Sequence, residues 1–226
     1  MNIAILGTGM VGRTLAGKLA ALGHDVVVGT RDVDELMART EPTRGGRVPP
    51  FSQWHETNSA VNVDTFAGAA AIGEILFLAA AGNAAIDVLK GAREDNLEGK
   101  VLIDVSNPLD HSYSPPALSV CNTESLAEQI QNTFPRTKVV KALNTMNASV
   151  MADPRAVGDG DHNVFMSGND ATAKEKVAEL LREFGWEYIV DLGDITTARG
   201  TEMYLPLWLR AMQALGTSNF NLKLVT

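Results

Sequence analysis

The chain has 226 residues, of which 45% are hydrophobic, and its formal net charge at pH 7 is −8. This length predicts one large domain, or one domain with an appendage. The acidic balance argues against a nucleic-acid surface, and no run of the sequence approaches the ~18 apolar residues of a membrane span. Cys121 is the one cysteine, so an internal disulfide is excluded and no metal site is expected.

A glycine-rich turn between two apolar runs is the strongest pattern in the chain. The sequence predicts a strand over Asn2–Leu6, a helix over Met10–Leu22 and a second strand over Asp25–Val28. The turn that joins the first strand to the helix has the G-x-G-x-x-G spacing of dinucleotide-binding units. It consists of Gly7, Thr8, Gly9, Met10, Val11 and Gly12.

Each glycine of this turn has its own expected role. Gly7 permits the tight turn, Gly9 lets the backbone approach a pyrophosphate, and Gly12 lets the helix pack closely on the strand. The helix N-terminus adds unpaired N–H groups and a partial positive charge, which attract an anion. The unit therefore predicts a dinucleotide site. Because its first strand uses the first apolar residues, we expect no signal peptide and a cytoplasmic protein.

The residues after the second strand indicate which dinucleotide is bound. NAD sites usually place Asp or Glu here, where the carboxylate binds the ribose 2′-hydroxyl and would repel a 2′-phosphate. This chain has Thr30 and Arg31 instead, and a guanidinium can give a phosphate two charge-assisted hydrogen bonds. Asp32 would favour NAD if it pointed into the pocket, but it also stands where the next helix can begin. We therefore predict a preference for NADP.

Beyond this unit, strand and helix signals continue to alternate. Short apolar runs predict strands over Glu74–Ala79, Lys100–Val105, Lys138–Leu143, Asn163–Ser167 and Glu187–Asp191. Helices are predicted over Thr65–Ile72, Ala84–Ala92, Ser125–Thr133 and Asp170–Phe184. This alternation is typical of a Rossmann-type α/β fold, with a doubly wound, mainly parallel sheet covered on both faces. Ligands of such sheets bind outside the carboxyl ends of the strands.

Three further strand ends carry small or polar residues that suit a ring-binding pocket. They are Ala79, Ala80 and Ala81; Asn107 and Pro108; and Asn144, Thr145 and Met146. The alanine run offers a wall for a flat ring, although its composition suits a featureless loop almost as well. The amides and the hydroxyl would lie where a nicotinamide carboxamide or a second ring binds, but a single Asn is more often a turn former.

The segment Glu41–Asn62 is longer than the connection that a simple unit of this type requires. One interpretation is a lid, in which an arginine folds over the adenosine end and an aromatic ring stacks there. The side chains available for a lid are Arg39, Arg44, Arg47, Phe51 and Trp54. The other interpretation is a mobile surface insertion without a functional role.

The last thirty residues include an apolar helix, predicted over Thr201–Leu215. A helix that is apolar on most faces must be buried, yet about 30 residues are too few for a separate substrate domain. We therefore expect residues 1–195 to form the NADP-binding domain and residues 196–226 a helical extension buried in a homodimer. Leu205 and Pro206 of this extension would join Asn144, Thr145 and Met146 in an acceptor pocket.

No acid–base constellation stands out in the sequence. Each histidine is expected at the surface rather than in catalysis, and they are His24, His55, His111 and His162. Lys141 lies inside an apolar strand. It is either a proton donor of the imine-reductase or hydroxyacid-dehydrogenase kind, or a structural residue that ends at the sheet edge or pairs with a carboxylate.

Taken together, five segments give the chain a family resemblance. They are GTGMVG, LGHDVVVGTRD, LIDVSNPL, VVKALNTM and DLGDITTARGTEMYLPLWL. These segments resemble the NADP oxidoreductases that use the deazaflavin coenzyme F-420, nearly from end to end except for residues 41–62. A similar module forms the cytoplasmic reductase portion of a group of membrane metalloreductases. The resemblance implies a Rossmann fold, NADP as cofactor and a deazaflavin or flavin as acceptor.

The resemblance also implies roles for individual residues. Those matching Thr8–Val11 contact the pyrophosphate, and those matching Thr30 and Arg31 hold the 2′-phosphate. The residues that would border the nicotinamide half are Ala79, Ala80, Asn107 and Ala148. One position departs from the family: members often carry a Lys just past the Arg, and in this chain Glu35 stands near that position. Arg39 or an arginine of the long loop is the candidate substitute.

Three functions fit these patterns. The first is hydride transfer between NADP(H) and a deazaflavin or flavin. This reaction needs proximity and orientation of two rings, worth up to roughly 7–11 kcal/mol, and no side-chain nucleophile. The second is a dehydrogenase or reductase of a small carbonyl or imine substrate. The third is an NADP-binding redox sensor without turnover.

Overall fold

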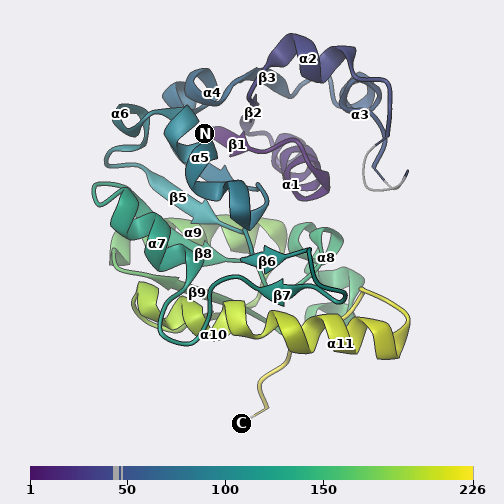
Figure 1. Cartoon of the computed structure of the whole chain (residues 1–226), viewed down its shortest axis with the longest axis vertical. Helices are drawn as coiled ribbons and strands as arrows, with labels where there is room; N and C mark the ends of the chain where they lie inside the picture. The colour runs from purple at the N-terminus through teal and green to yellow at the C-terminus, as the bar shows by residue number, and fades with distance from the viewer. Residues whose placement is uncertain (43–45, 47, 226) are drawn as a thin grey trace.

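An eight-stranded sheet forms the centre of the computed structural model, which describes residues 1–42, 46 and 48–225 (Figure 1). The strands lie in the order β10-β9-β8-β5-β4-β1-β2-β3, and every neighbouring pair is parallel except β8 with β9. Their bounds are β1 (Asn2–Leu6), β2 (Asp25–Thr30), β3 (Asn62–Thr65), β4 (Ile75–Leu78), β5 (Val101–Asp104), β8 (Lys138–Ala142), β9 (Asn163–Gly168) and β10 (Tyr188–Asp191). The predicted mainly parallel, Rossmann-type sheet is confirmed.

Two apolar layers cover the sheet because its central strands are hydrophobic on both faces. One layer is built from α1 (Met10–Ala21), α3 (Phe51–Thr57), α8 (Ala148–Ala152) and α9 (Ala171–Phe184). The other is built from α4 (Phe66–Ile72), α5 (Ala85–Ala92), α7 (Leu126–Thr133) and α10 (Ala198–Met203). The remaining helices are α2 (Val33–Ala38), α6 (Glu94–Leu97), α11 (Leu205–Leu215), and the short 3-10 turns η1 (Gly82–Ala84), η2 (Pro154–Ala156), η3 (Gly158–Gly160) and η4 (Ile195–Thr197).

Residues 48–62 differ from the predicted surface insertion. Arg13 of α1 donates from Nη1 to the carbonyl of Pro49 at 2.6 Å and lies over the ring of Phe51. Phe51 is 1% exposed in the core, and Trp54 packs beside it with ring centroids 5.1 Å apart. Both the mobile insertion and the lid built on these two aromatic residues are therefore wrong for this part of the segment. Arg44 and Arg47 lie outside the described residues.

The apolar segment predicted as one helix is two, α10 and α11, with Tyr204 between them. Pro206 lies in the first turn of α11 and has no N–H to donate to the carbonyl of Glu202, four residues earlier. The break therefore follows from one missing hydrogen bond. It separates a buried helix from an exposed one, since Glu202 is 1% exposed and Leu207 is 63% exposed.

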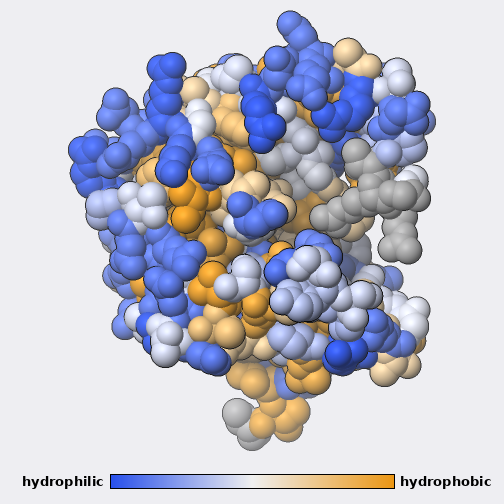
Figure 2. Space-filling model, viewed as in Figure 1, coloured by the Kyte–Doolittle hydropathy of each residue, from blue (hydrophilic) through white to orange (hydrophobic). Residues whose placement is uncertain are grey.

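The chain ends beside α11, after turning back toward the sheet. The carbonyl of Leu222 accepts from the backbone N–H of Asn163, and the N–H of Leu224 donates to the Asn163 side chain. Figure 2 shows hydrophobic residues at the lower edge of the molecule, where the tail and α11 lie in Figure 1. Within residues 1–42, 46 and 48–225, no helix combines the length and the apolar character that crossing a membrane requires.

Candidate functional site

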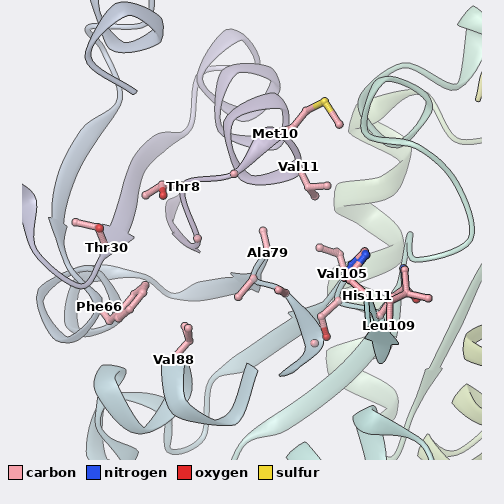
Figure 3. A pocket seen from close by; sticks show the side chains of 17 residues that line it. Thr8, Met10, Val11, Thr30, Phe66, Ala79, Val88, Val105, Leu109 and His111 are labelled. Carbon is pink, nitrogen blue, oxygen red and sulfur yellow. The ribbon is translucent and has the colours of Figure 1, made fainter. Parts of the chain in front are cut away.

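The carboxyl ends of the central strands border a cavity of about 420 Å3. It opens between β1 and β4, where the chain order of the sheet reverses and ligands of such sheets bind. Thr30 and Phe66 lie at one end of the cavity, and Val105, Leu109 and His111 lie at the other (Figure 3). The predicted site residues that line it are Gly7, Thr8, Gly9, Met10, Val11, Thr30, Ala79, Ala80, Ala81 and Asn107.

The glycine turn at the middle of this cavity has the geometry that a dinucleotide needs. Gly7 has φ of +134°, and a Cβ added there would lie 2.4 Å from the carbonyl oxygen of Ala79. A Cβ on Gly12 would lie 2.1 Å from the carbonyl oxygen of Gly7, so this residue permits the close contact of helix and turn. Gly9 instead faces open space, with nothing within 4 Å of an added Cβ. The turn therefore leaves room for a ligand at its central glycine alone.

The first turn of α1 offers unpaired donors beside that space. The helix begins after Gly9, and its first internal hydrogen bond runs from the Arg13 N–H to the Gly9 carbonyl. The N–H groups before Arg13 therefore have no partner within the helix. Among the described residues no side chain caps this end, and the first turn contains no acidic residue. This arrangement favours an anion such as a pyrophosphate.

A smaller cavity of about 190 Å3 continues from the Thr30 end, since Thr8, Thr30 and Phe66 border both spaces. Arg31 borders the smaller cavity and is exposed. The carboxylate of Asp32 accepts a 2.8 Å hydrogen bond from the backbone N–H of Glu35, which makes Asp32 the N-cap of α2. Asp32 thus begins the helix, as one alternative predicted, and it also borders the smaller cavity beside Arg31.

Arg39 also borders the smaller cavity. Its guanidinium donates to Glu35 at 3.0 Å, one helical turn away, and both side chains are largely exposed. Glu35 therefore does not leave a bare negative charge near the position where family members often have a Lys. Exposed pairs of this kind are weak, typically 0–1 kcal/mol, so Glu35 holds the Arg39 guanidinium only loosely.

Two amides face each other at the opposite end of the site. The Asn107 side chain donates to the Asn144 carbonyl at 2.9 Å, and the Asn144 side chain donates to Asn107 Oδ1 at 3.0 Å. Asn144 is 1% exposed, so it lies behind Asn107 rather than in the cavity. It follows Leu143, whose φ of +63° is rare for a bulky residue and costs about 1–3 kcal/mol. The surrounding contacts must hold this turn in place.

Several predicted site residues lie outside the cavity. Buried behind it or beneath neighbouring elements are Gly12, Pro108, Asn144, Thr145, Met146, Ala148 and Leu205. Pro206 borders a separate space of about 390 Å3 between α11 and the short strand β7 (Ala117–Leu118). The partner of β7 is β6 (Leu109–Asp110), which contributes Leu109 to the cofactor cavity. The β6–β7 hairpin thus separates the two spaces.

A buried charge cluster lies beneath the nicotinamide end of the predicted site. The Lys141 ammonium lies 2.9 Å from Asp104 Oδ2 and 2.8 Å from Glu202 Oε1, and each of the three side chains is at most 1% exposed. Burial acts to lower the pKa of Lys141, but attraction to both carboxylates outweighs it and raises the pKa above its ordinary value. Removing one partner of such a cluster typically costs about 3–5 kcal/mol.

Lys141 thus pairs with carboxylates, as one of the sequence alternatives predicted. It does not end at the sheet edge, because β8 lies between β5 and β9. It does not border the cavity either, so the geometry gives no support to a proton donor of the imine-reductase kind.

The sequence did not indicate two residues that line the cavity, Phe66 and His111. Phe66 begins α4 directly after β3 (Asn62–Thr65), a strand that the sequence did not indicate. His111 was expected at the surface, and it is exposed but borders the cavity from the residues after β6. For His162, a surface position is wrong: it is 4% exposed and its Nε2 lies 2.9 Å from the Pro154 carbonyl. No local pattern marks either histidine.

Known proteins are similar to this chain in sequence and in fold. Residues 2–108 match the family described as NADP oxidoreductase, coenzyme F420-dependent. The crystal structure of a candidate F420-dependent NADP-reductase from Arthrobacter sp. FB24 is 55% identical with a TM-score of 0.96, and the match covers 100% of both chains. F420-dependent NADP reductase from Methanothermobacter marburgensis is 28% identical over 92% of this chain and 90% of its own.

A second kind of relative is a longer protein. Metalloreductase STEAP3 from Rattus norvegicus is 32% identical over 92% of this chain, and the match covers 38% of that protein's length. This chain therefore spans well under half of that relative. The full-length likeness to the reductases and the glycine-turn cavity point the same way: the chain belongs to the family of coenzyme F420-dependent NADP oxidoreductases.

Proposed function

We propose that this protein transfers a hydride between NADP(H) and a deazaflavin or flavin acceptor. One observation carries the proposal: a continuous cavity runs from Thr30 past the glycine turn to the alanine wall and Asn107. Its lining suits a dinucleotide, with unpaired N–H groups of the first turn of α1 at its centre and small residues at the ring end. The names of the Methanothermobacter marburgensis and Arthrobacter relatives, an F420-dependent NADP reductase and a candidate one, support the choice of acceptor.

In this proposal the two ends of the cavity bind different parts of NADP. Thr30 and Arg31 bind the 2′-phosphate, with Arg39 beside them, and the N–H groups of the first turn of α1 bind the pyrophosphate. The alanine wall and Asn107 hold the nicotinamide. Gly12 supports this arrangement through close packing rather than contact with the ligand.

The proposed reaction requires the protein to orient the nicotinamide and the acceptor ring. Bound NADPH would supply a hydride with both electrons of its C–H bond, and solvent would supply the proton that completes reduction of the acceptor. No covalent bond to a side chain forms, so the chain must align two rings and exclude water from between them. Ala80, with its small side chain, lets the ring approach the sheet closely.

The acceptor would bind next to the nicotinamide end of the cavity. We propose that Asn144, Thr145, Met146, Ala148 and Leu205 support this part from beneath, since all five are buried. Pro206 would contribute from α11, within the extension of residues 196–226. The space between α11 and β7 adjoins the hairpin that borders the cavity, and a bound acceptor could extend across this hairpin.

An acceptor panel tests the proposed function. Purified protein is mixed with NADPH and, in separate reactions, coenzyme F420, FMN, FAD, a small ketone and a cyclic imine, and NADPH oxidation is followed by absorbance. Fast oxidation by the deazaflavin or a flavin is expected. Oxidation by the ketone or imine alone would identify a dehydrogenase instead. Tight NADPH binding without oxidation by any acceptor would identify a redox sensor.

We further propose that the protein is a homodimer whose interface includes α11. Leu207 and Leu215 of this helix are 63% and 61% exposed, which is unusual for large apolar side chains on one helix. A second copy related by two-fold symmetry would cover them. Trp208, part of the apolar pattern that predicted this interface, stacks on Phe220 of its own chain and is therefore a poor probe of the interface.

Leu207→Glu is expected to convert the protein to a monomer at micromolar concentration, because it would bury an unpaired charge in the interface. Sedimentation or light scattering measures the mass. Gln213→Glu serves as the control, since it adds the same charge at an exposed position on a different side of α11. A monomeric unmodified protein would rule out the dimer.

A further inference from the structure

The turn that carries Asn107 into the cavity is held by a buried carboxylate and a buried ammonium. Asp104 Oδ1 accepts from the backbone N–H of Ser106 at 2.9 Å and from its hydroxyl at 2.6 Å. Lys141 Nζ donates to the Ser106 carbonyl at 2.6 Å. Both hydrogen-bonding groups of the Ser106 backbone are therefore fixed by side chains of the charge cluster, one residue before Asn107.

The same cluster reaches the C-terminal extension through Glu202. Besides contacting Lys141, this carboxylate accepts from the backbone N–H groups of Leu126 at 2.7 Å and Ala127 at 3.1 Å, which belong to the first turn of α7. The cluster holds two carboxylates and one ammonium, and the positive end of the α7 dipole offsets part of the excess negative charge. Lys141 of β8 thus pairs with a carboxylate from β5 and with another from α10.

The turn has little freedom on its other sides. A Cβ on Gly82 would lie 2.1 Å from the carbonyl oxygen of Asn107, so η1 packs directly against it. The Asn107 amide is paired with Asn144, which also donates to the carbonyl of Thr201 in α10, at 3.2 Å. Movement of the Lys141 ammonium would therefore be transmitted to Ser106, and from there to Asn107 in the cavity.

We propose that Lys141 is a positioning residue for the nicotinamide half of the cofactor site. Held between Asp104 and Glu202, its ammonium fixes the Ser106 carbonyl and with it the orientation of Asn107. Lys141 does not touch the cofactor in this arrangement. The inference rests on the proposed function, in that it assigns the Asn107 end of the cavity to nicotinamide.

Two probes separate the halves of the site: NADPH, and 2′,5′-ADP, which has the adenosine and its phosphates but no nicotinamide. Lys141→Met is expected to weaken NADPH binding about tenfold, the loss that follows when about 1.4 kcal/mol of favourable contact disappears. Binding of 2′,5′-ADP should stay within about twofold. The fluorescence emission of bound NADPH, which reports the surroundings of the nicotinamide, should shift toward that of free NADPH. Calorimetry measures both affinities.

A second variant and a control make the test decisive. Asp104→Asn keeps the oxygen that accepts from Ser106 but removes the charge that holds Lys141, so a smaller loss confined to NADPH is expected. Lys138→Met removes a partly exposed lysine of the same strand, paired with Asp170, and should change neither affinity. If Lys141→Met does not fold, Asp104→Asn alone decides.

Equal losses of both probes would overturn the proposal, because they indicate general destabilisation. Unchanged NADPH affinity and emission in the folded variants would overturn it too. An unmodified protein that binds neither probe would instead contradict the proposed function, so the two failures are distinguishable.

Discussion

Ala80→Trp is expected to reduce turnover with the best acceptor at least about a hundredfold, equivalent to about 2.7 kcal/mol in the activation barrier. Ala80 lines the cavity just after β4, where the proposed nicotinamide ring lies against the sheet. An indole at this position would occupy the space of that ring. Stopped-flow or steady-state oxidation of NADPH measures the loss, and binding of 2′,5′-ADP should survive because Thr30 and Arg31 lie at the far end.

Asn83→Trp is the matched control for this variant. Asn83 lies three residues further along the chain, in η1, where it is exposed and does not border the cavity. The same indole there should leave turnover near that of the unmodified protein. Full activity of Ala80→Trp would show that this strand end does not line the ring pocket.

Arg31→Ala is expected to cost roughly 1.5–3 kcal/mol of NADP affinity, the scale of hydrogen bonds to a charged group. NAD affinity should hardly change, because NAD has no 2′-phosphate for the guanidinium to bind. Arg31 borders the small cavity together with Asp32, whose carboxylate accepts from the Glu35 N–H as the N-cap of α2. Titration calorimetry with both nucleotides gives the comparison.

Arg31→Lys refines the same experiment. It keeps the positive charge but loses the planar pair of donors, so an intermediate loss of NADP affinity is expected. Comparable losses of NADP and NAD in Arg31→Ala would mean that Arg31 does not read the phosphate. The preference for NADP would then have to come from Thr30 or Arg39, which border the same small cavity.

Local patterns were enough to predict the sheet and the edge at which it binds ligands. Short apolar runs indicate the buried strands β1, β2, β4, β5 and β8, because parallel strands covered on both faces must be hydrophobic throughout. The close packing at Gly12 also follows from spacing, since the carbonyl oxygen it approaches belongs to Gly7 of the same turn, whereas the contact of Gly7 is with Ala79 after β4. The residues that these strand ends bring to the cavity were therefore largely predictable.

Features that depend on distant partners could not be predicted in this way. Phe51 is buried in the core layer that includes α1, and Arg13 of that helix holds Pro49 and lies over the ring. The partners of Lys141 come from β5 and α10, so the sequence could indicate a carboxylate partner without naming Asp104 or Glu202. Pro206 alone could have predicted the break between α10 and α11, because proline interrupts a helix. The continuous apolar pattern favoured a single helix instead.

The contacts of Arg13 affect local unfolding of the protein. Its guanidinium joins the Thr8 carbonyl of the glycine turn, at 2.8 Å, to the Pro49 carbonyl before α3. Local unfolding of the segment around α3 removes the Pro49 contact of Arg13, the same guanidinium that holds the Thr8 carbonyl, so Arg13 couples this segment to the turn. A dinucleotide that binds the folded turn raises the free energy of that opening as well. The ligand would then stabilise the segment around α3 without contacting that segment.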